Sequence, residues 1–175
     1  MYIGLTSVII LIVLVIFYFF VRPAQKAENV SNFEECVHAG YAILESYPPQ
    51  CVTKDGKSFT QDIGNELEKA GQIQIESPRP NAEIKSPLKL TGKARGSWFF
   101  EATFQVKLYD QDGKLLGSTA AQAQGDWMSE DFVPFTAMLK FDPPSGNKGK
   151  LVLEKDNPSG LPENADSLYL PIKFK

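Results

Sequence analysis

Histidine and cysteine are scarce in this sequence, which has one His and two Cys among its 175 residues. The chain therefore lacks the side chains for a multi-ligand zinc site, for an iron–sulfur cluster and for chemistry that needs two histidines. An excess of positive charge is also missing, because 18 Lys and Arg stand against 21 Asp and Glu. A nucleic-acid-binding domain needs such an excess to offset phosphate charge. We predict no metal, no cofactor and no nucleic-acid partner.

Charged side chains are absent from residues 1–21, and residues 8–21 consist only of Val, Ile, Leu, Phe and Tyr. A helix of about 20 apolar residues, rising ~1.5 Å per residue, spans the ~30 Å hydrocarbon core of a bilayer. Arg22 and then a proline mark the end of the apolar run. This pattern is typical of a membrane-spanning helix.

Two kinds of cleaved leader fit the same segment less well. A secretory signal peptide begins with positive charge, which this segment lacks, and a lipoprotein signal needs a cysteine directly after the apolar run. The first cysteine is Cys36. We therefore predict an uncleaved transmembrane anchor at residues 1–22, followed by a polar tether at residues 23–31.

The orientation of the anchor rests on opposing signals. Arg22 and Lys26 follow the apolar run, and the positive-inside rule would place them in the cytoplasm. Two charges are a weak signal, however, and large domains translocate largely regardless of charge. The cysteine pair and the fold expected downstream favour the outside. We predict a single-pass protein of the cytoplasmic membrane with its C-terminal domains on the extracytoplasmic side.

Residues 32–63 are predicted to form a small α/β module that contains both cysteines. A unit of this size has too little apolar core to be stable alone, so a disulfide between Cys36 and Cys51 is expected; it would stabilise the module by ~3 kcal/mol. Free buried thiols are the alternative, and His38 alone cannot complete a zinc site with them. Ser31 and Glu34 fit a helix capping box, which predicts a helix from Phe33 to Ala39.

In the second half of this module, the Asp55-Gly56 dipeptide predicts a tight turn that joins two strands in a β-hairpin. Residues 47–59, which read Tyr-Pro-Pro-Gln-Cys-Val-Thr-Lys-Asp-Gly-Lys-Ser-Phe, are similar to the middle of Kazal-type protease-inhibitor modules. That family uses six cysteines to hold its inhibitory loop, whereas this chain has two. Protease inhibition is therefore kept only as a remote alternative.

Residues 64–71 are predicted to be a linker, and residues 72–175 an all-β domain. Apolar residues alternate with polar ones from Phe100 to Leu108, which is typical of half-buried antiparallel strands. The same period recurs around residues 73–75, 88–90, 135–141, 151–153 and 168–174. The number of such segments predicts an immunoglobulin-like antiparallel sandwich of about seven strands.

Six segments of the C-terminal domain form a recognisable set: Ile75-Glu76-Ser77-Pro78, residues 86–95 (Ser-Pro-Leu-Lys-Leu-Thr-Gly-Lys-Ala-Arg), Trp98 to Ala102, Asp112-Gly113-Lys114, Gly125 to Met128 and Glu130 to Phe135. These segments carry a resemblance to the immunoglobulin-like domain of bacterial spore germination proteins. It covers essentially all of residues 72–175. The resemblance implies an extracytoplasmic bacterial domain, and it brings no catalytic residues.

The residues themselves also argue against an enzyme. A Ser–His–Asp or Cys–His arrangement would have to use His38, which shares its module with cysteines expected to be bonded. The carboxylates of Asp126, Glu130 and Asp131 are most simply explained as solvated loop residues. We therefore predict a protein without catalytic activity.

The candidate binding surface is aromatic. Trp98 and Trp127 lie near Arg95, Glu101 and Asp126 in the sequence, and together these five residues are predicted to form it. The predicted function is a membrane-anchored binding or adhesion module of the cell envelope, with a cell-wall glycan or an envelope protein as partner. The alternative is a structural spacer or assembly partner in an envelope complex. A binding platform requires exposed tryptophan rings, whereas a spacer would bury both.

Overall fold

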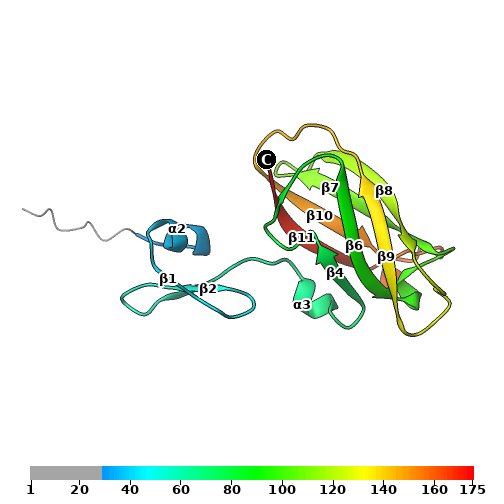
Figure 1. Cartoon of the computed structure of the whole chain (residues 1–175), viewed down its shortest axis with the longest axis horizontal. Coiled ribbons are helices and arrows are strands. Elements are labelled where there is room, and N and C mark those ends of the chain that lie inside the picture. Colours follow the sequence, from blue (N-terminus) through cyan, green and yellow to red (C-terminus); the bar gives the residue numbers. More distant parts are fainter. Residues whose placement is uncertain (1–28) are drawn as a thin grey trace, which may run out of the picture. The chain divides into compact units, whose positions relative to one another are not determined.

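The computed structural model describes residues 29–175, which divide into a first unit ending at Gln61 and a second unit from Asp62 to Lys175 (Figure 1). The predicted anchor at residues 1–22, and the tether as far as residue 28, lie outside the described residues. Within residues 29–175, no helix is long and apolar enough to cross a bilayer.

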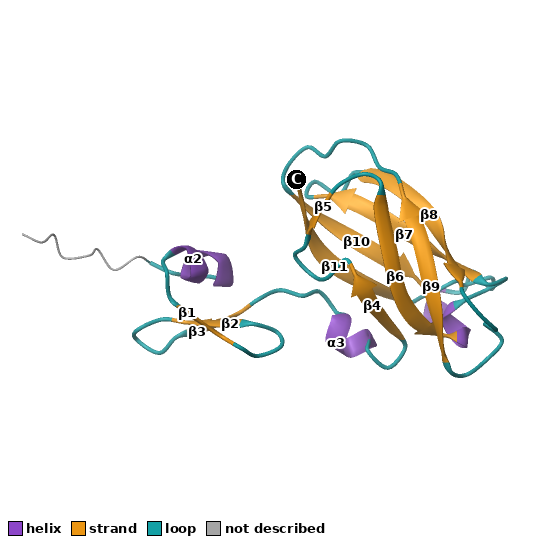
Figure 2. Cartoon of the chain, viewed as in Figure 1, coloured by secondary structure: helices purple, strands orange, loops and turns teal. Residues whose placement is uncertain are grey.

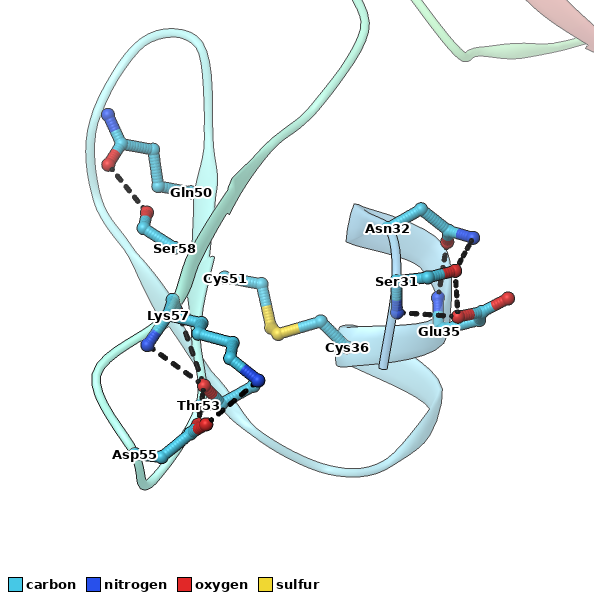
Figure 3. Close-up of a disulfide and its surroundings, with 10 residues drawn as sticks. All are labelled: Ser31, Asn32, Glu35, Cys36, Gln50, Cys51, Thr53, Asp55, Lys57 and Ser58. Atoms are coloured by element: carbon cyan, nitrogen blue, oxygen red, sulfur yellow. Dashed lines mark hydrogen bonds and ion pairs between the residues drawn. A yellow bond between two sulfur atoms is a disulfide. The ribbon is translucent and has the colours of Figure 1, made fainter. Parts of the chain in front are cut away.

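The first unit is a helix packed beside a small sheet. Helix α2 (Phe33–His38) precedes strands β1 (Ala42–Leu44), β2 (Gln50–Val52) and β3 (Ser58–Thr60), which pair antiparallel in the order β1-β2-β3. A disulfide joins Cys36 on α2 to Cys51 on β2, with 6.0 Å between their Cα atoms (Figure 3). Both cysteines are fully buried. The predicted bridge is thus confirmed, and it connects helix to sheet at the centre of the unit.

The cap of α2 lies one residue later than the sequence suggested. Asn32 is the N-cap, and its Oδ1 accepts a hydrogen bond from the Glu35 N–H at 2.9 Å. Ser31 instead donates its N–H and its hydroxyl to the Glu35 carboxylate, at 2.8 and 2.7 Å (Figure 3). These hydrogen bonds from Ser31 lower the pKa of Glu35. Asn is itself a strong cap residue, and it takes the place that the Ser31–Glu34 box was expected to fill.

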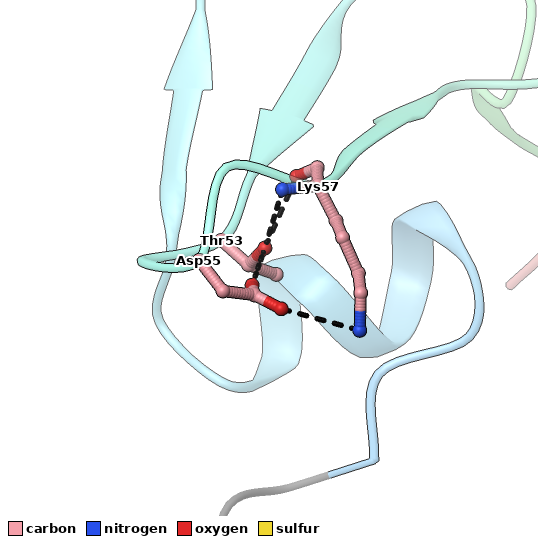
Figure 4. A network of polar contacts seen from close by, with 3 residues as sticks. All are labelled: Thr53, Asp55 and Lys57. Carbon is pink, nitrogen blue, oxygen red and sulfur yellow. Dashed lines mark hydrogen bonds and ion pairs between the residues drawn. The ribbon is translucent and has the colours of Figure 1, made fainter.

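The predicted hairpin joins β2 to β3 through Asp55-Gly56. Gly56 has φ +82°, a left-handed conformation that glycine adopts without strain. The Thr53 hydroxyl donates to Asp55 at 2.5 Å and accepts from the Lys57 N–H at 3.1 Å, and the Lys57 ammonium lies 3.2 Å from the Asp55 carboxylate (Figure 4). The hydrogen bond from Thr53 lowers the pKa of Asp55. The turn is therefore held by its own side chains.

The second unit is a curled eight-stranded sheet (Figure 2). Its strands are β4 (Ile73–Ser77), β5 (Glu83–Ile84), β6 (Leu88–Arg95), β7 (Thr103–Asp110), β8 (Leu115–Ala123), β9 (Phe132–Leu139), β10 (Lys148–Glu154) and β11 (Ser167–Phe174), in the order β4-β6-β9-β8-β7-β10-β11-β5. Strands β8 and β9 pair at only two positions. Phe104 on β7 meets Phe135 on β9 edge-on, with 4.9 Å between ring centroids. The sheet thus folds over at β8–β9 into a sandwich filled by side chains from both layers.

The strand count and pairing differ slightly from the prediction. The domain has eight strands instead of about seven, because the two-residue strand β5 adds to the sheet edge. Strand β5 pairs parallel to β11, so the sandwich is not wholly antiparallel. A two-residue strand is too short to show an alternation of polar and apolar residues, so β5 could not be found from that pattern.

The apolar alternation correctly predicted the core of β7, β10 and β11, but it began too early. Strand β7 starts at Thr103, and Phe100 is 43% exposed. Glu101 and Ala102 have φ of +48° and +63°, in a tight turn whose ends, Phe100 and Thr103, exchange backbone hydrogen bonds. A turn residue with positive φ cannot continue a strand, so the side chain of Phe100 leaves the core face.

Residues 64–71, predicted as a linker, belong to the second unit. They include the one-turn helix α3 (Glu66–Lys69), and both Asn65 and Glu66 are buried. The Glu66 carboxylate forms a 2.6 Å ion pair with Arg79, whose guanidinium also donates to the Ile75 carbonyl of β4 at 2.7 Å. Helix α3 contacts both β4 and β11. It therefore bridges β4, at one edge of the sheet, and β11, the second strand from the other edge (Figure 1).

Candidate functional site

The two tryptophans do not form an exposed platform. Trp98 lies on the 3₁₀-helix η1 (Gly96–Trp98) and is 1% exposed, within the core of the sandwich. Trp127 is partly buried and packs against the same core. A Cβ on Gly96 would lie 1.9 Å from the Ser129 carbonyl oxygen, so η1 and the loop that carries Trp127 touch backbone to backbone. The prediction of an aromatic surface from both rings is wrong, because the short helix turns Trp98 inward where strand alternation breaks down.

The charged residues expected beside these rings have local structural contacts. The Arg95 guanidinium donates to the carbonyls of Gly71 and Glu130, at 3.2 and 3.0 Å, and lies over the ring of Phe132. Asp126 accepts a hydrogen bond from the Met128 N–H at 3.0 Å within its loop. Glu101 lies in the positive-φ turn before β7. The contacts of Arg95 and Asp126 thus hold loop backbone in place, and the burial of Trp98 removes one ring from the predicted surface.

A polar groove of about 690 Å³ lies elsewhere on the second unit, and we call it the Tyr169 groove. It is lined by Asn65, Glu68, Lys69, Gln105, Glu154, Lys155, Asp156, Asn157, Ala165, Asp166, Ser167 and Tyr169. Three parts of the chain form it: the segment at α3, the outer face of β7, β10 and β11, and the loop from β10 to β11, which contains the 3₁₀-helix η2 (Pro162–Asn164). The volume falls within the ~300–1,000 Å³ typical of small-ligand sites.

The floor of the Tyr169 groove is the solvent face of three paired strands. Gln105 on β7, Glu154 on β10 and Ser167 on β11 are register partners and therefore lie in one row. Tyr169 lies two residues further along β11, on the same face, and is 41% exposed. Its chain neighbours Leu168 and Leu170 are fully buried on the opposite face. The alternation that buries the leucines thus presents a large aromatic ring to solvent.

The side of the groove that contains Asn65 is hydrogen-bonded to β11, the strand that carries Tyr169. The Asn65 side chain accepts from the Tyr169 N–H at 2.8 Å and donates to the Ser167 carbonyl at 2.9 Å. The Asn65 N–H donates to the Tyr169 carbonyl at 3.3 Å. Gly64 has φ +71°, and a Cβ there would lie 2.0 Å from that same carbonyl oxygen. The free edge of β11 is thereby hydrogen-bonded along the groove, and Tyr169 is held in place.

Three of the six charged side chains that line the Tyr169 groove are in ion pairs. The Lys69 ammonium lies 2.6 Å from Asp166, and Lys107, just beside the groove, lies 2.7 Å from Glu154. The hydrogen bond that the Lys107 ammonium donates to the Glu154 carboxylate raises the pKa of Lys107. The lining holds four carboxylates (Glu68, Glu154, Asp156 and Asp166) and two lysines (Lys69 and Lys155). The groove therefore offers an array of donors and acceptors without surplus positive charge.

No residue of the Tyr169 groove was selected from the sequence. Its parts come from residues 65–69, 105, 154–157 and 165–169, which no local motif connects. One signal was available: Tyr169 is a large aromatic at a solvent-facing position of the alternation in residues 168–174. Within residues 29–175, no group of three or more His, Cys, Asp or Glu side chains is placed to hold a metal ion.

The searches of curated proteins and of solved structures each returned no match. The family model of the immunoglobulin-like domain of bacterial spore germination matches residues 72–160. The resemblance expected over residues 72–175 is therefore confirmed as far as residue 160, and Asn65 and Tyr169 lie outside the matched range. Because that range covers more than half of the 175 residues, the chain belongs to the family of the immunoglobulin-like domain of bacterial spore germination.

Proposed function

We propose that this protein is a membrane-anchored, non-catalytic binding module of the bacterial cell envelope, and that its second unit binds a ligand in the Tyr169 groove. The groove is the main support for this proposal. It contains an exposed aromatic ring surrounded by polar side chains, on a strand whose edge is hydrogen-bonded to Asn65. A preorganised site loses less conformational entropy on binding than a flexible one. The immunoglobulin-like family is consistent with a module that binds without turnover.

An extracytoplasmic location is supported by the first unit and by the N-terminal sequence. Disulfides such as Cys36–Cys51 persist mainly in oxidising compartments. The charge-free, apolar run at residues 8–21 has the length of a membrane span. An anchored chain with its folded units outside would hold the groove close to the bilayer and the cell wall.

A structural spacer is the second candidate, and the burial of Trp98 favours it over an aromatic platform. The two functions differ in one measurable property. A spacer holds other parts of a complex at a fixed distance and needs no saturable ligand site. A binding module shows saturable binding that weakens when residues of its site are substituted.

The test measures how the full chain, purified in detergent micelles, binds isolated bacterial cell-wall fragments. We expect saturable binding that Tyr169→Ala weakens by about thirtyfold, since truncation of an aromatic anchor often costs ~2 kcal/mol or more. Tyr109→Ala is the matched control: Tyr109 lies on the solvent face of β7 in the same sheet but does not line the groove. Absence of saturable binding would favour the spacer, and binding that Tyr169→Ala leaves unchanged would mean that the ligand binds outside the groove.

A further inference from the structure

We propose that the ligand of the Tyr169 groove is a neutral, polyhydroxylated oligosaccharide that stacks on the ring of Tyr169. This inference rests on the binding function proposed above and adds the chemical class of the ligand. Three properties of the groove point to it: the presentation of the ring, the balance of charge, and the side chains that remain available for hydrogen bonds.

The Tyr169 ring is an exposed apolar surface inside a polar groove, and it belongs to a residue whose backbone is fixed on both sides. Its backbone is hydrogen-bonded to Asn65 on one side, and the residue pairs with Val152 of β10 on the other. The Lys150 ammonium lies over the ring at 6.0 Å from its centroid and does not line the groove. A tyrosine has few rotatable bonds, so a ring held this way offers contact area at low entropic cost. The apolar face of a sugar ring, with C–H groups on one side and hydroxyls at the rim, matches such a surface.

The charge balance disfavours both anionic and strongly cationic ligands. Lys69 is paired with Asp166, and Glu154 is paired with Lys107. The remaining charged side chains of the lining are Glu68, Asp156 and Lys155, which leaves a surplus of one negative charge. A phosphate polymer would find no unpaired cluster of cations, and a lysine-rich peptide would find little net attraction.

Hydroxyl groups fit the side chains that remain available. The exposed Gln105 amide makes no hydrogen bond to any of residues 29–175, and the same holds for the side chains of Glu68 and Asp156. An amide both donates and accepts, and carboxylates accept. A sugar hydroxyl also both donates and accepts, so adjacent hydroxyls are able to satisfy Gln105 and a carboxylate together. The groove is thus matched to a ligand with many hydroxyls and no net charge.

The experiment treats cell-wall fragments in three ways before adding the full chain in detergent. Protease removes proteins, dilute-acid extraction removes anionic phosphate polymers, and glycoside-hydrolase digestion cleaves the glycan. We expect binding to survive the first two treatments and to fall after the third. In the same assay Tyr169→Phe, which keeps the stacking face, should bind as the native chain does, and Tyr169→Ala should bind about thirtyfold more weakly.

Each other outcome has a distinct meaning. Binding that is lost after protease or acid extraction, but still depends on Tyr169, overturns the oligosaccharide and leaves the binding function standing with a protein or phosphate ligand. Binding that Tyr169→Ala does not weaken overturns the groove as the site. Absence of binding to untreated fragments overturns the proposed function as well.

Discussion

Asn65 and Tyr169 are 104 positions apart in the sequence and are joined by reciprocal hydrogen bonds, from the Tyr169 N–H to the Asn65 side chain and from the Asn65 N–H to the Tyr169 carbonyl. This pairing covers the edge of β11, which would otherwise present open backbone groups to other strands. It also fixes the backbone of Tyr169, the residue whose ring lines the groove. The segment before the sandwich therefore contributes to both the stability and the site of the second unit.

Asn65→Ala is expected to destabilise the second unit by about 1–3 kcal/mol, because it leaves the Tyr169 N–H and the Ser167 carbonyl without their partner. Chemical denaturation of the full chain, followed by tryptophan fluorescence, measures this because both tryptophans lie in the second unit. Asn147→Ala is the control, since Asn147 is exposed and its side chain makes no hydrogen bond to the described residues. Equal stability of the two variants would show that the Asn65 contacts contribute nothing.

Trp98→Ala is expected to cost about 3–5 kcal/mol, as large-to-small substitutions in a core do. Trp127→Ala should cost less, because Trp127 is only partly buried. Thermal unfolding of both variants compares them directly. A Trp98→Ala variant that melts with the native chain would mean that the ring is not in the core.

How far the sequence predicts this fold depends on the range of the interactions involved. Alternation of polar and apolar residues is local, and it correctly predicted the buried faces of β7, β10 and β11. The two cysteines correctly predicted the bridge, since a small unit has few other sources of stability. The sequence did not predict that the strand pattern is interrupted at Glu101 and Ala102, because neither Glu nor Ala is a residue type that commonly adopts a positive φ.

The candidate site was not predictable in the same way. The groove forms only because the segment that contains Asn65 lies along the edge of β11 at Tyr169, 104 residues later in the sequence. Nothing near Asn65 in the sequence specifies β11 as its partner. Glu66 was likewise predicted to be part of the linker, although its ion pair with Arg79 lies where α3 covers the sandwich. Conversely, Trp98 and Trp127 were predicted to form a surface because large aromatics are common at binding sites, whereas η1 buries Trp98 and Trp127 packs partly against the same core.

Reduction of the disulfide is expected to unfold the first unit selectively. A bridge across 15 positions stabilises by ~3 kcal/mol on the chain-entropy model, and the unit has little other core. Limited proteolysis with and without reductant should show new cleavage within residues 32–61, with no change in tryptophan emission from the second unit. The Cys36→Ser and Cys51→Ser double variant should behave as the reduced chain does. Resistance of the reduced first unit to protease would contradict this.

Asp110 provides a pH-dependent contribution to stability. Burial alone would raise its pKa, but the hydrogen bonds it accepts from the Lys114 N–H, the Ser145 hydroxyl and the Asp112 N–H lower it below the ordinary value. The folded pKa thus lies below the unfolded pKa of ~3.9. The stabilisation is present above that unfolded pKa and is lost as the pH falls through the folded one.

Asp110→Asn should therefore melt below the native chain at neutral pH, and the gap should narrow in acid. Thermal melts across that range measure it. A gap that stays constant from neutral to strongly acidic pH would argue against an ionised Asp110 in these hydrogen bonds.

The claim that the Tyr169 groove is the binding surface is tested most directly by amide hydrogen exchange of the full chain, with and without soluble fragments released from the cell wall. Bound ligand is expected to slow exchange in residues 65–69, 154–157 and 165–169, which together line the groove. Loop 124–131, which carries Trp127, should exchange at the same rate in both samples. Protection confined to loop 124–131, with residues 165–169 unchanged, would contradict the account.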